Sequence, residues 1–122
     1  MNLLESGEMY LETILVLSRE KPLVRSIDVV NYMGFSKPSV SRAVKNLKDA
    51  GYINMGDDNY LSLTDSGREV AEKIYERHTV LTKLLVSIGV DEKTASLDAC
   101  KMEHDISEVT FEAIKNHITE KR

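Results

Sequence analysis

Two helix signals in tandem constrain the fold of this chain more than any other feature of its sequence. Ser26 can cap a first short helix that ends at Gly34, and Ser36 can cap a second helix directly after it. In the second helix Pro38 is tolerated in the first turn, and Gly51 ends the helix. Two helices joined by a short turn that contains glycine are typical of a helix-turn-helix.

A β-hairpin is predicted directly after the second helix. In the segment YINMGDDNYLSLT, residues 52–64, two short β-like runs flank the turn GDDN. Leu61 and Leu63 alternate with less apolar neighbours, as in a half-buried strand. A hairpin after a helix-turn-helix is a wing, and a further helix is expected over residues 5–20. Residues 1–64 are therefore predicted to form a winged-helix domain.

The second half of the sequence reads as helices. The segment SGRE, residues 66–69, fits a capping box that opens a long helix. Apolar positions recur on it every three or four residues, with one histidine among them: Ile74, His78, Leu81, Leu85 and Ile88. Gly89 ends this helix, and Asp91 starts another.

A last helix is predicted over residues 107–122, with Val109, Ala113 and Ile118 facing inward. A chain of 122 residues is long enough for about one domain or two small units that share a core. The predicted fold class is mainly α: an N-terminal winged helix-turn-helix, followed by a second, helical domain over residues 65–122.

Charge is distributed unevenly along the chain. The net charge is −4, yet residues 21–48 contain six bases and one acid, so this segment carries +5. Residues 65–122 carry twelve acids and nine bases, which leaves them near −3. Such asymmetry is typical of a protein in which one part meets a polyanion and another does not.

Double-stranded DNA is the polyanion that this pattern favours. Recognition helices contact base edges mainly with N-terminal residues, while neighbouring Lys and Arg neutralise phosphates. A solvated helix face is the usual explanation of a charge run, but here the turn, the basic bias and the wing agree. The residues predicted to bind DNA are Arg25, Ser36, Lys37, Pro38, Ser39, Ser41, Arg42 and Lys45.

The only cysteine lies in the segment DACKMEHDIS, residues 98–107. On a helix, positions i, i+3 and i+4 share one face, so Cys100, Glu103 and His104 would offer a thiolate, a carboxylate and an imidazole together. Each also has an ordinary explanation, because a cysteine can be a small buried hydrophobe and the other two can be surface residues. His78 can likewise be a satisfied core histidine. A Cys–His catalytic pair is disfavoured, since no oxyanion site or third orienting group stands at a recognisable spacing.

Other features bear on where the chain works. No run of about 18 apolar residues occurs, so no membrane span is expected. The start of the sequence, MNLLESGEMY, carries acids early and no basic-then-apolar signal. One cysteine cannot form an internal disulfide, which is compatible with a reducing cytoplasm. We expect a cytoplasmic protein that is not an enzyme.

Four segments together resemble the diphtheria-toxin-repressor family of metal-dependent transcription factors, which has iron-sensing and manganese-sensing branches. They are GEMYLETILVL, SKPSVSRAVKNLKDAGYI, LSLTDSGREVAEKIYERHTVLTKLL and DACKMEHDIS, and they cover nearly the whole chain in the family's order. The resemblance implies a homodimer that binds palindromic operators of metal-uptake genes and dimerises through its second, metal-binding domain. It also implies a short form without the SH3-like domain of many iron-type members.

The same resemblance implies a set of metal ligands. They are Met9, Glu12, His78, Cys100, Glu103 and His104. Met9 and Cys100 look like the iron-sensing branch, whereas Glu12 looks like the manganese-sensing branch. Thr82 and Ser96 stand where iron-type members place a glutamate and a second histidine, which puts an ancillary site of that type in doubt. Ligand softness favours Fe(II), with Mn(II) next, and Zn(II), Co(II) or Cd(II) could bind in vitro.

Two alternatives stay open on the sequence. A metal-independent winged-helix regulator would bind DNA equally with or without a chelator. A metal-binding or hydrolytic protein without a DNA role would show no salt-dependent DNA affinity, and it leaves the +5 segment unexplained.

Overall fold

The computed structural model describes residues 5–120 and is mainly helical. The elements, in chain order, are α1 (Glu5–Glu20), β1 (Val24–Arg25), α2 (Ser26–Met33), α3 (Lys37–Asp49), β2 (Ile53–Met55), β3 (Tyr60–Leu63), α4 (Asp65–Ser87), α5 (Glu92–Met102) and α6 (Glu108–Glu120). The described residues form two compact units, which divide between Glu72 and Lys73, so that α4 begins in the first unit and continues into the second. The last two residues of the predicted final helix, Lys121 and Arg122, lie outside the described residues.

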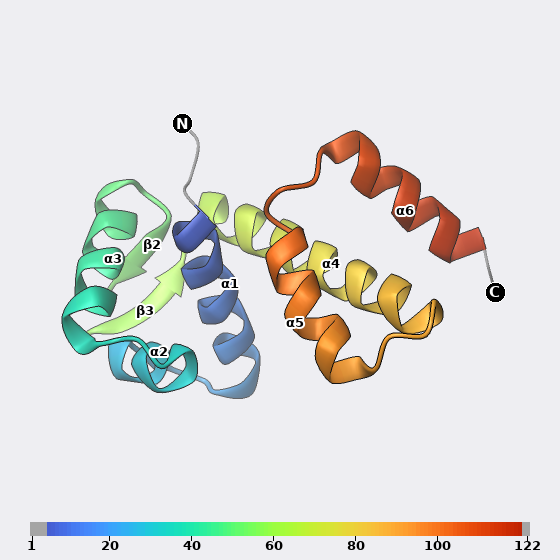
Figure 1. Cartoon of the computed structure of the whole chain (residues 1–122). Helices are drawn as coiled ribbons and strands as arrows, with labels where there is room; N and C mark the ends of the chain where they lie inside the picture. The colour runs from blue at the N-terminus through green and yellow to red at the C-terminus, as the bar shows by residue number, and fades with distance from the viewer. Residues whose placement is uncertain (1–4, 121–122) are drawn as a thin grey trace. The chain divides into compact units, whose positions relative to one another are not determined.

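The N-terminal unit contains the predicted helix-turn-helix and wing. Figure 1 shows α2 and α3 beside the β2–β3 hairpin. The hairpin turns at residues 56–59, and β1 pairs with the other side of β3, which gives an antiparallel sheet in the order β1-β3-β2. The strand β1 was not expected from the sequence. The mainly α fold with a winged helix-turn-helix is confirmed.

Aliphatic side chains hold this unit together. Leu11, Ile14 and Leu15 of α1 are fully buried, and they share one core cluster with Val29 of α2 and Val40 of α3. Full burial stabilises each such side chain by about 1.5–3 kcal/mol relative to exposure. The apolar spacing on α1 therefore sets which face of that helix meets the helix-turn-helix.

Local signals set most helix ends. The Ser36 hydroxyl caps α3 by accepting a 3.3 Å hydrogen bond from the Ser39 N–H, as predicted. Two other caps differ from prediction by one or two residues. The N-cap of α2 is Arg25 rather than Ser26, because the Arg25 N–H donates to the Asp28 carboxylate at 2.9 Å. The cap at the start of α4 is the Thr64 hydroxyl, which accepts from the Gly67 N–H at 3.1 Å, rather than Ser66.

Gly67 lies where α4 passes very close to the chain entering the wing. A Cβ atom at this position would overlap the carbonyl oxygen of Tyr52. The Thr64 hydroxyl also donates to the Gly51 carbonyl at 2.7 Å, and the Thr64 N–H donates to the Tyr52 carbonyl at 3.1 Å. The first turn of α4 is thereby fixed to the segment that joins α3 to β2.

In the C-terminal unit, α5 and α6 pack on α4. The buried side chains there include Ile74, Leu81, Ala95, Ala99 and Phe111. The predicted apolar seam on α4 is confirmed at Ile74 and Leu81. It is wrong at Ile88, whose side chain is 68% exposed beyond the end of α4.

The inward face of α6 also differs from prediction. Val109 is 80% exposed and Ala113 is exposed, whereas Phe111 is buried and Ile118 is half-buried. Positions 111, 114 and 118 follow helical spacing, so the large Phe111 side chain determines the buried face and turns Val109 outward. Within residues 5–120, no helix is both long and apolar enough to cross a membrane.

Candidate metal site and nucleic-acid surface

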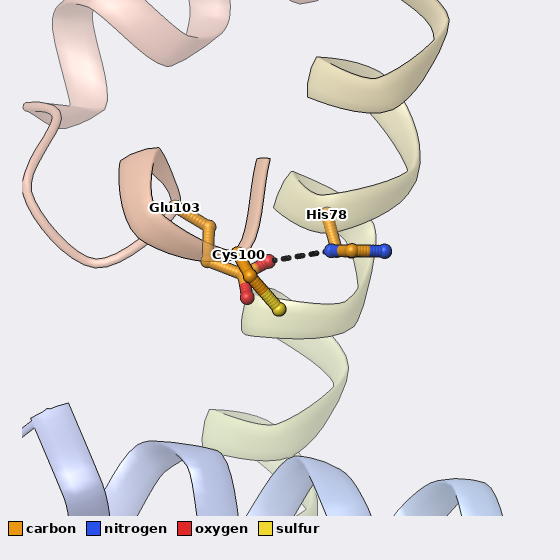
Figure 2. Close-up of side chains that lie close together, drawn as sticks. All are labelled: His78, Cys100 and Glu103. Atoms are coloured by element: carbon orange, nitrogen blue, oxygen red, sulfur yellow. Dashed lines mark ion pairs between the residues drawn. The ribbon is translucent and has the colours of Figure 1, made fainter. Parts of the chain in front are cut away.

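Three potential metal ligands meet between α4 and α5. His78 lies on α4, Cys100 lies on α5, and Glu103 directly follows α5. One ligand atom from each lies within 4.8 Å of the other two, and Figure 2 shows Cys100 and Glu103 facing His78. An imidazole, a thiolate and a carboxylate at this separation fit a divalent transition metal.

Glu103 is the centre of this cluster and is fully buried. Its Oε2 atom lies 3.2 Å from His78 Nδ1. The distance is short, yet neither carboxylate oxygen accepts a hydrogen bond of good geometry from any residue in the range 5–120. A buried carboxylate without directed donors destabilises a fold by several kcal/mol unless a positive charge compensates it. In the metal-free chain the protonated His78 ring, 3.2 Å away, supplies positive charge, and a bound metal cation would take over this role.

His78 carries a proton at neutral pH in the metal-free chain. Its interactions with Cys100 and, next, with Glu103 raise the pKa of His78 to about 10, although partial burial acts to lower it. The other ring nitrogen, Nε2, lies 3.2 Å from Ser96 Oγ, a contact that sequence reasoning missed. Metal ligation requires a neutral imidazole, so a metal that binds here must displace a proton.

His104 is close to the cluster. The prediction that it lies on the same helix as Cys100 is wrong. The helix α5 ends at Met102, Glu103 keeps a helical conformation as its C-cap, and His104 lies in the turn that follows. The His104 side chain is 2% exposed, with Nε2 3.6 Å from Glu103 Oε1. It lies outside the group of three whose ligand atoms are mutually within 4.8 Å.

Three of these residues differ in burial from what their ordinary explanations predict. Cys100 is exposed rather than a buried hydrophobe, and the Glu103 and His104 side chains are buried rather than at the surface. The other two predicted ligands, Met9 and Glu12, are half-buried on α1 in the N-terminal unit. Their part in a metal site stays a prediction.

The α3 helix separates an apolar face from a basic one. Val40, Val44 and Leu47 are buried. Most of the predicted DNA-binding residues in and beside this helix are exposed: Ser36, Lys37, Pro38, Ser41, Arg42 and Lys45. Ser39 is half-buried, and its hydroxyl accepts a 2.9 Å hydrogen bond from the Ser36 hydroxyl. The cap thus occupies Ser36 and Ser39, while the hydroxyl and basic groups further along the helix face outward.

Arg25 reaches the wing. Its guanidinium lies over the Tyr60 ring, with Cζ 4.5 Å from the ring centroid, and Nη2 donates to the Tyr60 hydroxyl at 3.0 Å. Arg25 and Tyr60 are opposite each other in the β1–β3 pairing. Sequence reasoning did not select Tyr60, because the pairing depends on a two-residue strand.

The N-terminal unit is a winged helix in which α3 has an exposed basic face, and the C-terminal unit is helical and holds the cluster of His78, Cys100 and Glu103. This combination is typical of transcriptional regulators of the winged-helix class. Residues 2–59 match the iron dependent repressor N-terminal DNA binding domain, and residues 64–120 match the iron dependent repressor metal binding and dimerisation domain. The chain belongs to the iron-dependent repressor family.

Named relatives agree with this family. The chain is 34% identical over 114 residues to a helix-turn-helix transcriptional regulator of Methanocaldococcus jannaschii, with 91% of this chain and 90% of the relative covered. It is 35% identical to the transcriptional regulator MntR of Escherichia coli O157:H7, with 87% of this chain and 68% of the relative covered. It is 32% identical to the iron-dependent repressor IdeR of Mycobacterium tuberculosis, with 87% of this chain and 46% of the relative covered.

Solved structures show the same fold. A manganese-dependent transcriptional repressor in complex with manganese superposes with a TM-score of 0.85 at 24% identity, over 93% of this chain and 52% of that chain. This chain therefore spans about half the length of that repressor and of IdeR.

Proposed function

We propose that this chain is a metal-activated transcriptional repressor, which binds palindromic operators of metal-uptake genes as a homodimer when Fe(II) or Mn(II) is present. The observation that carries the proposal is the buried Glu103 carboxylate, which faces His78 and Cys100 within the family's metal-binding domain. We assign DNA binding to residues 1–64, and metal binding and dimerisation to residues 65–122.

The proposed metal ligands are those predicted from the sequence. His78, Cys100 and Glu103 are supported by their mutual proximity, and His104 by its burial beside Glu103. Met9 and Glu12 would contribute from α1. A bound divalent cation would neutralise the buried carboxylate and hold together side chains that come from different helices.

The donor types support Fe(II) first and Mn(II) next. A thiolate and a thioether favour softer or borderline metals, whereas carboxylates suit Mn(II). Proteins named for either metal are similar to this chain: the iron-dependent repressor IdeR is 32% identical, and a manganese-dependent repressor has the same fold. Zn(II), Co(II) and Cd(II) could bind more tightly in vitro, so affinity alone would not identify the physiological ion.

In the proposed DNA complex, Ser41, Arg42 and Lys45 of α3 face the major groove, and Arg25 neutralises a phosphate beside the wing. A dimer places its recognition helices one helical turn of DNA apart, about 34–36 Å. Metal needs only to favour the dimer arrangement with that spacing. A coupling of about 1–3 kcal/mol changes operator affinity roughly 5- to 150-fold. As a repressor the protein would act in the cytoplasm and would not be an enzyme.

Anaerobic selection from a random duplex library tests this function. The selection is run with Fe(II), with Mn(II) and with a chelator. We expect a palindrome that is enriched only with metal, and we expect Glu103→Gln, a near-isosteric change, to lose this enrichment. Enrichment with and without metal would contradict metal activation, and no enrichment in any condition would contradict DNA recognition.

A further inference from the structure

Arg77 is a buried arginine in the C-terminal unit, with only 7% of its surface exposed. Its Nη1 donates to the backbone carbonyl oxygens of Glu103 at 3.0 Å and of Ile106 at 2.9 Å. Its Nη2 lies 3.5 Å from Glu108 Oε1, and its Cζ lies 5.3 Å from the centroid of the Phe111 ring. A guanidinium satisfies several acceptors at once because its donors have a fixed, planar geometry, which a lysine cannot reproduce.

These contacts end at the central residue of the proposed metal site. His78, the next residue along α4, faces the carboxylate of Glu103, while Arg77 binds the carbonyl of the same residue. Two adjacent residues of α4 therefore hold the side chain and the backbone of Glu103. The last carbonyl groups of a helix have no partner within it, and a cation at a helix C-terminus interacts favourably with the helix dipole.

The same guanidinium also fixes the turn that carries His104. The two carbonyl groups that it binds belong to residues 103 and 106, on either side of His104. Its contacts with Glu108 and Phe111 tie this turn to the start of α6. We propose that Arg77 is a positioning residue of the metal site, which holds Glu103 and His104 ready for ligation without touching the metal.

This inference rests on the proposed function, because it assumes that Glu103 and His104 are ligands. Without the guanidinium, the carbonyl groups of Glu103 and Ile106 lose their donor and the turn can relax. Loss of an outer partner that orients ligands typically weakens metal affinity by about 10- to 100-fold. The effect should appear in metal binding itself, before any DNA is added.

The test measures Co(II) binding to the full chain, because the visible spectrum of Co(II) reports both the coordination geometry and a thiolate ligand. The variant is Arg77→Met, and its matched control is Lys73→Met. Lys73 lies one helical turn earlier on α4 and pairs with the same Glu108 at 3.1 Å, but its side chain is half-exposed. Arg77→Lys, which keeps the charge but not the fork of donors, is a second variant for the case that Arg77→Met does not fold.

We expect Arg77→Met to bind Co(II) about 10- to 100-fold more weakly and with a changed spectrum, Arg77→Lys to be intermediate, and Lys73→Met to match the wild type. A loss of folding stability alone would leave the spectrum of the folded, saturated protein unchanged. The positioning role is wrong if Arg77→Met keeps the wild-type affinity and spectrum. If Arg77→Met does not fold, the same result in Arg77→Lys would show this.

Glu103→Gln separates failure of this inference from failure of the proposed function. Wild-type chain that does not bind Co(II), or binding that Glu103→Gln leaves intact, would overturn the site and the role of Arg77 together. Binding that is lost in Glu103→Gln but unaffected in both Arg77 variants would overturn the role of Arg77 alone.

Discussion

The guanidinium of Arg25 lies over the ring of Tyr60, its cross-strand neighbour, and donates a 3.0 Å hydrogen bond to the Tyr60 hydroxyl. A long basic side chain at a protein surface usually samples many rotamers, and fixing it on binding opposes association. Arg25 is already held against the wing before DNA arrives. The pair therefore gives the wing a pre-positioned positive charge.

We expect Tyr60→Leu to weaken operator affinity by about two- to fivefold, because it removes a cation–π contact of about 0.5–1 kcal/mol. Arg25→Ala should weaken binding further and reduce the slope of log affinity against log salt by about 1. Fluorescence anisotropy over a salt series, with the selected operator, measures both. Lys48→Met is the control, since Lys48 lies in the last turn of α3 and is not among the predicted DNA-binding residues. An equal loss in the control would show a general charge effect instead.

Metal binding is expected to release a proton from His78. The interactions with Cys100 and then Glu103 raise its pKa from 6.5 to about 10, so the ring is charged at neutral pH, whereas a metal needs it neutral. Metal affinity should therefore rise with pH up to about 10. The charged ring also stabilises the metal-free fold, and this contribution has the opposite dependence on pH. It is complete below pH 6.5 and is lost as pH rises through about 10. Calorimetric Mn(II) titrations in buffers of different ionisation enthalpy count the protons, and a count of zero would contradict the assignment.

Asp28 should stabilise the start of α2. A hydrogen bond from Lys21 and then one from the Arg25 N–H lower the pKa of Asp28 below its ordinary 3.8. Asp28→Asn should lower the free energy of unfolding by about 1 kcal/mol at pH 7, as loss of a helix cap does. The contribution of the carboxylate is present above pH 3.8 and disappears as pH falls through its lower folded-state pKa. Urea unfolding at several pH values tests this, with Asp57→Asn in the exposed wing turn as the control.

The exposed apolar side chains of the C-terminal unit are expected to support the homodimer. Ile88 is 68% exposed and Leu97 is 58% exposed, in the part of the chain that matches the family's dimerisation domain. Ile88→Asp combined with Leu97→Asp should weaken dimerisation at least about tenfold, because a buried apolar anchor contributes more than about 1 kcal/mol. Sedimentation equilibrium measures the dissociation constant.

The control for this prediction is Leu23→Asp. Leu23 has a comparable exposure of 51% but lies in the N-terminal unit. Unchanged dimerisation in the double variant would mean that the dimer forms through another surface.

Elements with local signals were predictable from the sequence. The bounds of α1 follow from its apolar spacing, and the start of α3 follows from Ser36 at its cap. The strand β1 was not predictable, because two residues become a strand only through pairing with β3. Val109 was assigned to the wrong face for a similar reason, since the larger Phe111 decides which side of α6 is buried.

The sequence pointed to the three residues of the observed cluster but not to its geometry. The spacing of Cys100 and Glu103 placed them together, and the histidine in the apolar seam of α4 completes the cluster. The sequence could not show that Glu103 is fully buried or that α5 ends before His104. Arg77 had no sequence signal, because a charged residue on a helix is usually solvated.

Gly67 carries a consequence for how this protein can vary. It binds neither DNA nor metal in any proposal above, yet any side chain would collide with the Tyr52 carbonyl where α4 meets the chain entering the wing. Every missense change that a single nucleotide substitution can produce in a glycine codon introduces a Cβ atom. In a population of variants, this codon should therefore tolerate missense changes as poorly as the codon of a metal ligand does. A substitution of Gly67 would look like a loss of metal sensing although the ligands are intact.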